Sequence, residues 1–210
     1  NKAAQVKAFY APWEAKGDGK IIAGEYNGEM AKIKAMVETK KVTWDVVEVE
    51  SPDVARGCDE GLFEKIDWAK IGNKADFQPA AVQECGVGIF IWSTVMAYNG
   101  DKLKDGPKTW ADFWDTKKYP GQRSLRNLPR PTLEIALLAD GVPMDKLYPL
   151  DVDRAFRKLE QIKPDIATWW TSGGQSAQLI SDGEVDMIQA WNGRITAVQG
   201  SPQKTENKAR

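Results

Sequence analysis

The feature that most limits the fold of this chain is an alternation of strand-like and helix-like segments. Residues 20–26 and 43–49 carry the β-branched and aromatic side chains of strands, and the segment 29–40 between them repeats its apolar residues at helical spacing. A strand–helix–strand order favours a layered α/β domain with parallel strands and a right-handed crossover. The sequence therefore predicts the α/β class before any motif is considered.

Local signals predict further elements on both sides of that unit. Thr109 with Asp112 resembles a capping pair, and Asp151 precedes an apolar helical stripe that Pro164 ends. The other expected elements are a helix over 2–15, a turn or short helix over 51–56, a short strand over 62–66, an extended run over 89–99, a helix over 132–139, a strand over 165–170, a helix over 172–181, a strand over 185–191 and a helix over 192–198.

The length of the chain lies between one domain and two, because 210 residues at roughly 150 per domain give about one and a half. We expect two α/β lobes, an incomplete first lobe over 1–90 and a second lobe over 91–200, joined by the run 86–99. Residues 201–210 are polar and are expected to be flexible or to start a return crossing. Since the sequence begins at Asn1, either a targeting peptide has been removed or the numbering begins inside a longer protein.

Two cysteines indicate the compartment of the protein. Cys58 and Cys85 are each next to a glycine, where the backbone is free to bring them together. A disulfide closing this loop stabilises a protein by about 3 kcal/mol and is typical of an oxidising compartment. The alternative is two buried free thiols.

Charge and composition exclude several classes of function. The chain has 29 Lys and Arg against 30 Asp and Glu, a net charge of -1, without the basic footprint of a nucleic-acid-binding protein. It has no His, so a Ser-His-Asp or Cys-His pair, a His general base and a His metal ligand are all excluded. The longest apolar stretch, 86–98, falls short of the roughly 20 residues of a spanning helix. We expect a soluble chain with no cofactor, no metal and no nucleic-acid partner.

The candidate ligand-binding residues follow the predicted strands, because ligands of such sheets bind beyond the carboxyl ends of the strands. Ser51 comes just after the strand 43–49, and Trp92 and Ser93 lie in the extended run between the lobes. The alternative is that Ser51 belongs to a turn or helix cap and that Trp92 is a core residue.

A second group surrounds the helix expected over 172–181. Ser172 and Gln175 have capping-box spacing, and Gly173 lets a ligand approach free backbone N–H groups at a helix end that favours anions. An ordinary capped helix is the alternative. Trp170 and Trp191 end the two neighbouring predicted strands and are expected to form aromatic walls, unless they serve core packing alone.

Arginines accompany these strand ends. Arg194 follows Trp191 and is able to pair with a carboxylate. Arg123, Arg126 and Arg130 cluster before a helix that carries Thr132 and Glu134, and they either grip an anion or are solvated surface charges.

Several segments together resemble a known family. They are 25–37, 42–47, 57–61, 98–101, 108–114, 120–121, 182–185 and 191–193. In this order they are similar to the extracellular solute-binding proteins of bacterial ABC importers, in particular to the spermidine/putrescine branch.

The resemblance implies a periplasmic, two-lobed type II binding protein that closes over a solute, presents it to a membrane permease and has no catalytic residues. By position, Ser51 belongs to the first-lobe ligand loop, Trp92 and Ser93 to the first crossing, and Trp191 to an aromatic wall. Where polyamine binders carry carboxylates, this chain has Arg130–Thr132 and only Glu134 nearby. The family's initial strand and second crossing are also unmatched, so we expect an incomplete piece of the molecule.

We therefore expect a monomeric solute-binding protein for a small, polar, polyamine-like solute. A carboxylate-bearing or otherwise anionic solute is the first alternative, and a secreted enzyme with a carboxylate acid or base is an alternative of another class. The predicted ligand-binding residues are Ser51, Trp92, Ser93, Thr132, Glu134, Trp170, Ser172, Gly173, Gln175, Trp191 and Arg194.

Overall fold

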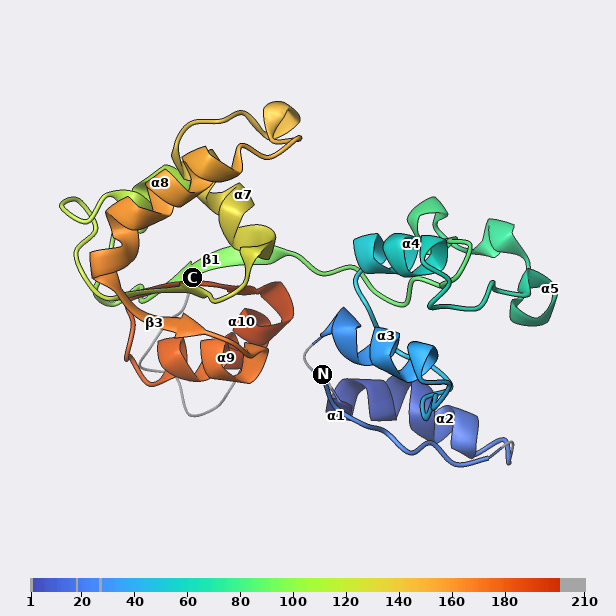
Figure 1. The fold of residues 1–210 in the computed structure, drawn as a ribbon. Coiled ribbons are helices and arrows are strands. Elements are labelled where there is room, and N and C mark those ends of the chain that lie inside the picture. The colour runs from blue at the N-terminus through green and yellow to red at the C-terminus, as the bar shows by residue number, and fades with distance from the viewer. Residues whose placement is uncertain (1, 18, 27, 201–210) are drawn as a thin grey trace. The chain divides into compact units, whose positions relative to one another are not determined.

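The computed structural model describes residues 2–17, 19–26 and 28–200. The chain divides into two compact units, the first over residues 1–89 and the second from residue 90 onward. Figure 1 colours the chain from blue at the start of the first unit to red near the end of the second.

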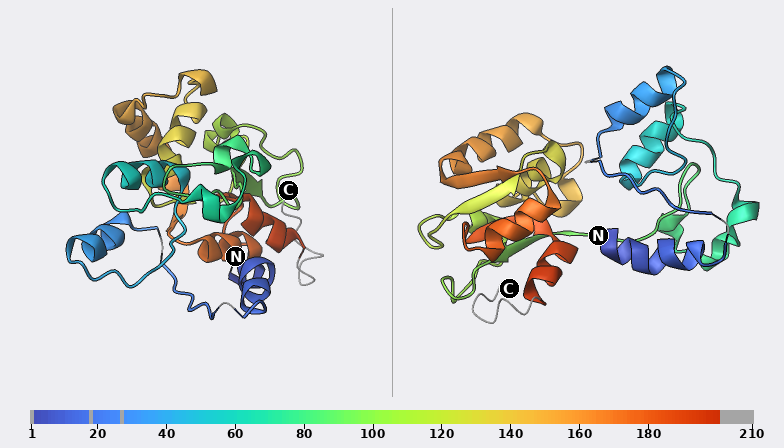
Figure 2. Two further views of the ribbon diagram at one scale, coloured as in Figure 1. Left: turned by 90° about the vertical axis from the view of Figure 1, so that its right-hand side faces the viewer. Right: turned by 90° about the horizontal axis from the view of Figure 1, so that it is seen from below.

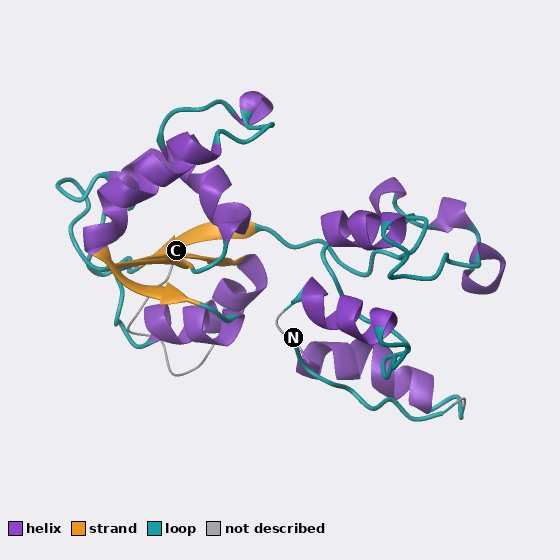
Figure 3. Cartoon of the chain, in the orientation of Figure 1, coloured by secondary structure: helices purple, strands orange, loops and turns teal. Residues whose placement is uncertain are grey.

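The first unit consists of helices and loops, as Figure 3 shows. A helical stretch runs without a break over residues 2–14, with a π-helical turn in its middle, which confirms the helix expected over 2–15. The amphipathic helix expected at 29–40 is also confirmed and buries Ile33. The helical elements are α1 (Lys2–Gln5), η1 (Val6–Tyr10), α2 (Ala11–Glu14), α3 (Met30–Glu38), α4 (Ser51–Asp59), α5 (Trp68–Ile71), η2 (Lys74–Asp76) and η3 (Pro79–Ala81).

One set of predictions for the first unit is wrong: the structure has no strands at 20–26, 43–49 and 62–66. Within the described part of the first unit, strand-like pairing is limited to one isolated two-residue bridge. A strand forms only where a neighbouring segment satisfies its backbone hydrogen bonds, and the periodicity of a segment carries no information about that neighbour. Ile22 and Val46, which a paired and covered sheet would bury, are 94% and 90% exposed.

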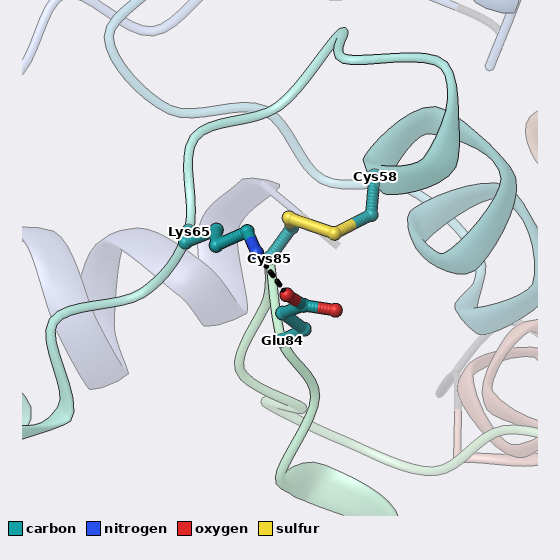
Figure 4. Close-up of a disulfide and its surroundings, with 4 residues drawn as sticks. All are labelled: Cys58, Lys65, Glu84 and Cys85. Carbon is teal, nitrogen blue, oxygen red and sulfur yellow. Dashed lines mark ion pairs between the residues drawn. A yellow bond between two sulfur atoms is a disulfide. The ribbon is translucent and has the colours of Figure 1, made fainter.

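The disulfide between Cys58 and Cys85 is confirmed, with a Cα–Cα distance of 5.7 Å. Figure 4 shows it at the end of α4, beside the ion pair of Lys65 and Glu84, whose Nζ and Oε1 atoms are 2.6 Å apart. The main-chain N–H of Ile66 also donates to the carbonyl oxygen of Glu84 at 2.8 Å. The disulfide therefore belongs to a group of three links that join residues 84–85 to α4 and to the loop that follows it.

A four-stranded mixed sheet forms the centre of the second unit. Its strands are β1 (Thr94–Tyr98), β2 (Arg123–Arg126), β3 (Ile166–Trp170) and β4 (Met187–Trp191), in the order β1-β4-β2-β3. β2 is parallel to both β3 and β4, whereas β1 is antiparallel to β4 and places Thr94 opposite Trp191. The carboxyl ends of the three parallel strands and the amino end of β1 therefore meet at one edge of the sheet.

Helices cover both faces of this sheet, as Figure 1 and the two further views of Figure 2 show. On one face, Phe113, Leu137 and Leu159 belong to a buried cluster with residues of β2 and β4. On the other face, Leu179 and Ile195 pack against the same sheet. The helices on the first face are α6 (Trp110–Trp114), α7 (Pro129–Ala139) and α8 (Val152–Ile162). Those on the second face are α9 (Gly173–Ser181) and α10 (Asn192–Gln199). The second unit also contains two short 3-10 turns, η4 (Met144–Lys146) and η5 (Lys163–Asp165). This layering confirms the α/β class.

The helix starts predicted from capping residues are confirmed. Thr109 and Asp112 form a complete capping box, in which the Thr109 hydroxyl accepts from the Asp112 N–H at 3.2 Å and the Asp112 carboxylate accepts from the Thr109 N–H at 2.9 Å. The Asp151 carboxylate accepts from the Arg154 N–H at 2.9 Å and begins α8. These starts were predictable because a cap and its helix are neighbours in sequence.

Strand β2 lies outside the elements predicted from the sequence. Its residues, Arg-Ser-Leu-Arg, include no β-branched or aromatic side chain, yet all four are buried. The Arg123 guanidinium donates to the carbonyl oxygens of Phe113 and Gly121, both at 2.7 Å, and burial lowers its pKa. Arg123 therefore holds the loop before β2 together, and neither predicted role, as an anion contact or as a solvated charge, applies to it.

None of the helices in the described part of the chain combines the length and apolar character that a membrane span requires.

Candidate functional site

The candidate site is the edge of the second unit's sheet where the parallel strands end. Arg126 is the last residue of β2, Trp170 of β3 and Trp191 of β4, and Thr94 begins β1 beside Trp191. The sequence predicted the strand ends at Trp170 and Trp191, and the topology brings them to the same edge as Arg126 and Thr94, which were not predicted as strand ends.

Three tryptophan rings meet at this edge. The ring centroid of Trp191 lies 5.5 Å from that of Trp170 and 5.8 Å from that of Trp92, both in edge-on arrangements. Trp170 is fully buried and its Nε1–H donates to the carbonyl oxygen of Gln189 at 2.8 Å. Trp92 and Trp191 are half-buried. Trp170 therefore anchors the cluster in the core, and the other two rings form its more accessible part.

The guanidinium of Arg126 lies over this aromatic cluster. Its central carbon is 5.0 Å from the ring centroid of Trp191 and 5.7 Å from that of Trp170, within the range of a cation–π contact. Nη1 donates to the carbonyl oxygen of Arg130 at 3.2 Å. Arg126 is only 7% exposed, so its charge is held in place in a largely water-excluded environment.

Several buried polar atoms of β1, β4 and α10 have no hydrogen-bond partner among the described residues. They include Nε1 of Trp191, Nε2 of Gln189, Nε of Arg194 and Oγ1 of Thr94. All four groups are able to donate a hydrogen bond, and three of them can only donate. A buried donor left without an acceptor costs about 1–3 kcal/mol. The edge therefore has a surplus of donors that a bound acceptor group would satisfy.

Helix α9 begins beside Trp191. Ser172 caps it by accepting from the Gln175 N–H at 3.2 Å, whereas the Gln175 side chain accepts from the Thr171 N–H at 2.9 Å rather than from the N–H of Ser172. Only half of the predicted capping box is therefore formed. A Cβ atom on Gly173 would lie 2.5 Å from the Trp191 ring and 2.8 Å from Nε of Arg194. The space left by the missing side chain is thus occupied by the Trp191 ring and the Arg194 side chain.

The remaining predicted residues make local contacts. Thr132 donates its hydroxyl to the carbonyl oxygen of Arg126 at 3.0 Å, which ties the start of α7 to the end of β2. Ser93 donates its N–H to Oδ1 of Asn192 at 3.1 Å. Ser51 belongs to the first unit, where it is the first residue of α4 and its hydroxyl accepts from Nε2 of Gln83 at 2.9 Å.

Glu134 lies on α7, four residues after Arg130, and the backbone of Arg130 and Pro131 between the helix start and Glu134 is not helical. One carboxylate oxygen accepts from the Tyr148 hydroxyl at 2.9 Å, and the other is buried without a partner among the described residues. Burial, followed by the contact with Glu134, raises the pKa of Tyr148. Glu134 is thus a buried acceptor, in contrast to the donors at the strand ends.

Gln189 is a site residue that the sequence reasoning missed. It is fully buried in the middle of β4, and its Oε1 accepts from the Arg126 N–H at 2.8 Å. A polar amide inside an otherwise apolar strand was the available signal, because such a side chain needs a specific partner. In the described residues no cluster of three or more His, Cys, Asp or Glu side chains has the arrangement of a metal site.

Residues 7–209 match the family model of the bacterial extracellular solute-binding proteins. The chain is 54% identical over 203 residues to a gamma-aminobutyric acid-binding protein of Pseudomonas aeruginosa, covering 94% of this chain and 57% of that protein. It is 25% identical over 182 residues to a spermidine/putrescine-binding periplasmic protein of Escherichia coli, covering 83% and 51%.

The fold of the chain is also similar to that of a solved structure. The binding protein MotA of A. tumefaciens B6, in complex with glucopine, superposes with a TM-score of 0.86 at 39% identity, covering 94% of this chain and 62% of MotA. The chain thus spans less than two thirds of the length of each of these relatives. Its α/β fold is that of the type II periplasmic binding proteins. The family resemblance seen in the sequence is confirmed: the chain belongs to the bacterial extracellular solute-binding proteins.

Proposed function

We propose that the protein is the periplasmic solute-binding component of an ABC importer and that its solute is a small amino-acid-like molecule with a carboxylate. It holds the solute without transforming it and delivers it to a membrane permease. Gamma-aminobutyric acid is the first solute to test, because it is the ligand in the name of a relative with 54% identity. Glucopine, bound to MotA at 39% identity, supports a carboxylate-bearing solute as well.

The observation that carries this proposal is the donor surplus at the edge of the sheet. Arg126 is held over the tryptophan cluster, and the nearby side chains of Gln189 and Trp191 have buried donors without acceptors among the described residues. The strand ends 126–128, 170–172 and 191–194 contain no Asp or Glu. Such a site favours an acceptor with negative charge, because a charged acceptor gains the most from buried donors.

The polyamine interpretation preferred from the sequence has weaker support. A polyamine presents only donors and positive charge, so it needs carboxylates where this edge supplies donors. Glu134 is a buried acceptor, but a single carboxylate matches only one amine. The relatives with polyamine names share 25% identity with this chain, less than half the identity of the gamma-aminobutyric acid binder.

Isothermal titration calorimetry of the complete protein tests the proposal. Gamma-aminobutyric acid, putrescine and spermidine are titrated separately, and heat is expected from the first and not from the two polyamines. The Arg157→Gln variant removes an exposed cation on α8, away from the strand ends, and serves as a matched control for general charge effects. Binding of putrescine or spermidine together with silence toward every carboxylate-bearing solute would contradict the proposal.

A further inference from the structure

We infer that Thr132 and Gln189 are positioning residues, which fix the main chain of Arg126 at the end of β2. Through Arg126 they hold the indole of Trp191, the half-buried ring that we take as a wall of the solute site. This inference rests on the proposed function, since it assumes that a solute binds at this edge. It adds two side chains that shape the wall without contacting the solute.

The ladder between β2 and β4 stops before the end of β2. The pairing of β2 with β4 ends at Ser124, opposite Ile188, whereas its pairing with β3 continues to Arg126. In a regular strand the N–H and the C=O of one residue point to the same neighbouring strand. The main-chain groups of Arg126 on the β4 side therefore need partners other than a strand backbone.

Two side chains supply these partners. Oε1 of Gln189 accepts from the Arg126 N–H at 2.8 Å, and the Thr132 hydroxyl donates to the Arg126 carbonyl oxygen at 3.0 Å. Gln189 is fully buried and Thr132 is 3% exposed, so bulk water does not compete for either bond. The two side chains thus take the place that a neighbouring strand has in a regular ladder.

These two bonds hold Arg126 from one side of the sheet, and its guanidinium packs on the other. Gln189 is two residues from Met187 in β4, so its side chain projects to the face that Met187 and Leu125 share with α7. Arg126 follows Leu125, so its side chain projects to the opposite face. There its central guanidinium carbon lies 5.0 Å from the ring centroid of Trp191, which packs against the second buried cluster. A shift of the Arg126 main chain therefore moves the group that lies over the Trp191 ring.

The same contacts leave Thr132 and Gln189 in a supporting role. The Thr132 hydroxyl has one hydrogen, which it donates to the Arg126 carbonyl oxygen. The main-chain carbonyl oxygen of Gln189 also accepts from Nε1–H of Trp170 at 2.8 Å, so Gln189 ties the ends of both β2 and β3 to β4. We therefore expect the effect of both residues on the solute to pass through the Trp191 ring.

The test compares variants that remove one of the two bonds with variants that keep both. Thr132→Val keeps the branched shape and loses the hydroxyl, whereas Thr132→Ser keeps the hydroxyl. Gln189→Met has a similar length and loses the acceptor. Ser124→Ala is the matched control, because it removes a hydroxyl that donates to the main chain of Thr168 and leaves both bonds to Arg126 in place.

Each variant of the complete protein is titrated with gamma-aminobutyric acid in a calorimeter, and its fluorotryptophan-labelled form is examined by fluorine NMR. The Trp191 resonance is assigned by its loss in Trp191→Phe, and the resonance of Trp68 in the first unit, assigned in the same way, is the internal reference. Thr132→Val and Gln189→Met are expected to shift the Trp191 resonance. They are also expected to weaken binding by about tenfold, which corresponds to about 1.4 kcal/mol of lost solute contact. Thr132→Ser and Ser124→Ala are expected to leave the resonance in place and the affinity within about twofold of wild type.

A purely structural role would lower the thermal stability of Thr132→Val and leave both the Trp191 resonance and the affinity unchanged, and this result would overturn the inference. Weaker binding with an unshifted resonance would overturn it as well, because the effect would not pass through the indole. So would a shifted resonance with unchanged affinity. If Thr132→Val does not fold, Gln189→Met decides by the same criteria. If the wild type binds no carboxylate-bearing solute, the proposed function fails, and the resonance alone decides whether Thr132 and Gln189 position Trp191.

Discussion

Gly173 offers a direct test of how the start of α9 shapes the site. Replacing it with Ala adds one Cβ atom at a position 2.5 and 2.6 Å from two carbons of the Trp191 ring and 2.8 Å from Nε of Arg194. Gly173 is buried, so the added methyl group has to displace these neighbouring side chains. Overpacking of this kind costs about 1–3 kcal/mol.

Gly174 is the matched control for this substitution. It is the next residue of the same helix turn and is exposed, and the nearest atom to an added Cβ, Oγ of Ser172, is 4.0 Å away. Gly→Ala raises the helix propensity by up to about 1 kcal/mol, and this gain is shared by the two variants. The difference in unfolding free energy between them therefore isolates the contact with Trp191.

The assay is urea unfolding of both variants of the complete protein, followed by titration with gamma-aminobutyric acid. Gly173→Ala is expected to be about 1–3 kcal/mol less stable than Gly174→Ala. It is also expected to bind about tenfold more weakly for each 1.4 kcal/mol of solute contact that is lost when the Trp191 ring is displaced. Equal stability and equal affinity of the two variants would show that Gly173 does not hold the Trp191 ring in place.

Other parts of the chain give three further tests. The double variant Cys58→Ser and Cys85→Ser opens a loop with a sequence separation of 27. It is expected to lower the unfolding free energy, measured by urea unfolding, by about 3.5 kcal/mol. Reduction of the wild type should reproduce this loss. Thr109→Ala removes the cap of α6 and is expected to cost about 1 kcal/mol, whereas Thr109→Ser should restore most of it in the same measurement. Burial, with smaller contributions from Glu48 and other acids, raises the pKa of Tyr26 to about 12. The folded protein then keeps a proton that the unfolded chain loses, so stability should fall between about pH 10 and pH 12, and ultraviolet titration of Tyr26→Phe should lack the corresponding ionisation.

The second unit was predictable because its signals are local. Caps such as Thr109 and Asp151 mark helix starts by contacts within three residues, and the strands that end at Trp170 and Trp191 carry β-branched, aromatic or other apolar side chains. The strands expected in the first unit were wrong because strand formation depends on a distant pairing segment that the periodicity does not contain. β2 was missed for the opposite reason: pairing with β3 and β4 overrides its poor propensity.

The candidate site was predictable in outline. The rule that ligands bind at the carboxyl ends of strands led to Trp170, Trp191 and Arg194, and the structure places all three at one edge. Gln189 was missed because the sequence shows only that an amide interrupts an apolar strand. Its role depends on which N–H groups approach its side-chain and main-chain oxygens from β2 and β3, and those contacts exist only in the folded sheet.

The pair of hydrogen bonds between Ser93 and Asn192 constrains how the connecting chain moves. Ser93 donates its N–H to Oδ1 of Asn192 at 3.1 Å, and Asn192 donates its main-chain N–H to the carbonyl oxygen of Ser93 at 2.9 Å. A backbone rotation at Ser93 has to break both, at a cost of about 1 kcal/mol each. Ile91, two residues earlier, is 80% exposed. These two hydrogen bonds therefore hold Ser93 against the start of α10, so the connecting chain is fastened to the second unit from Ser93 onward.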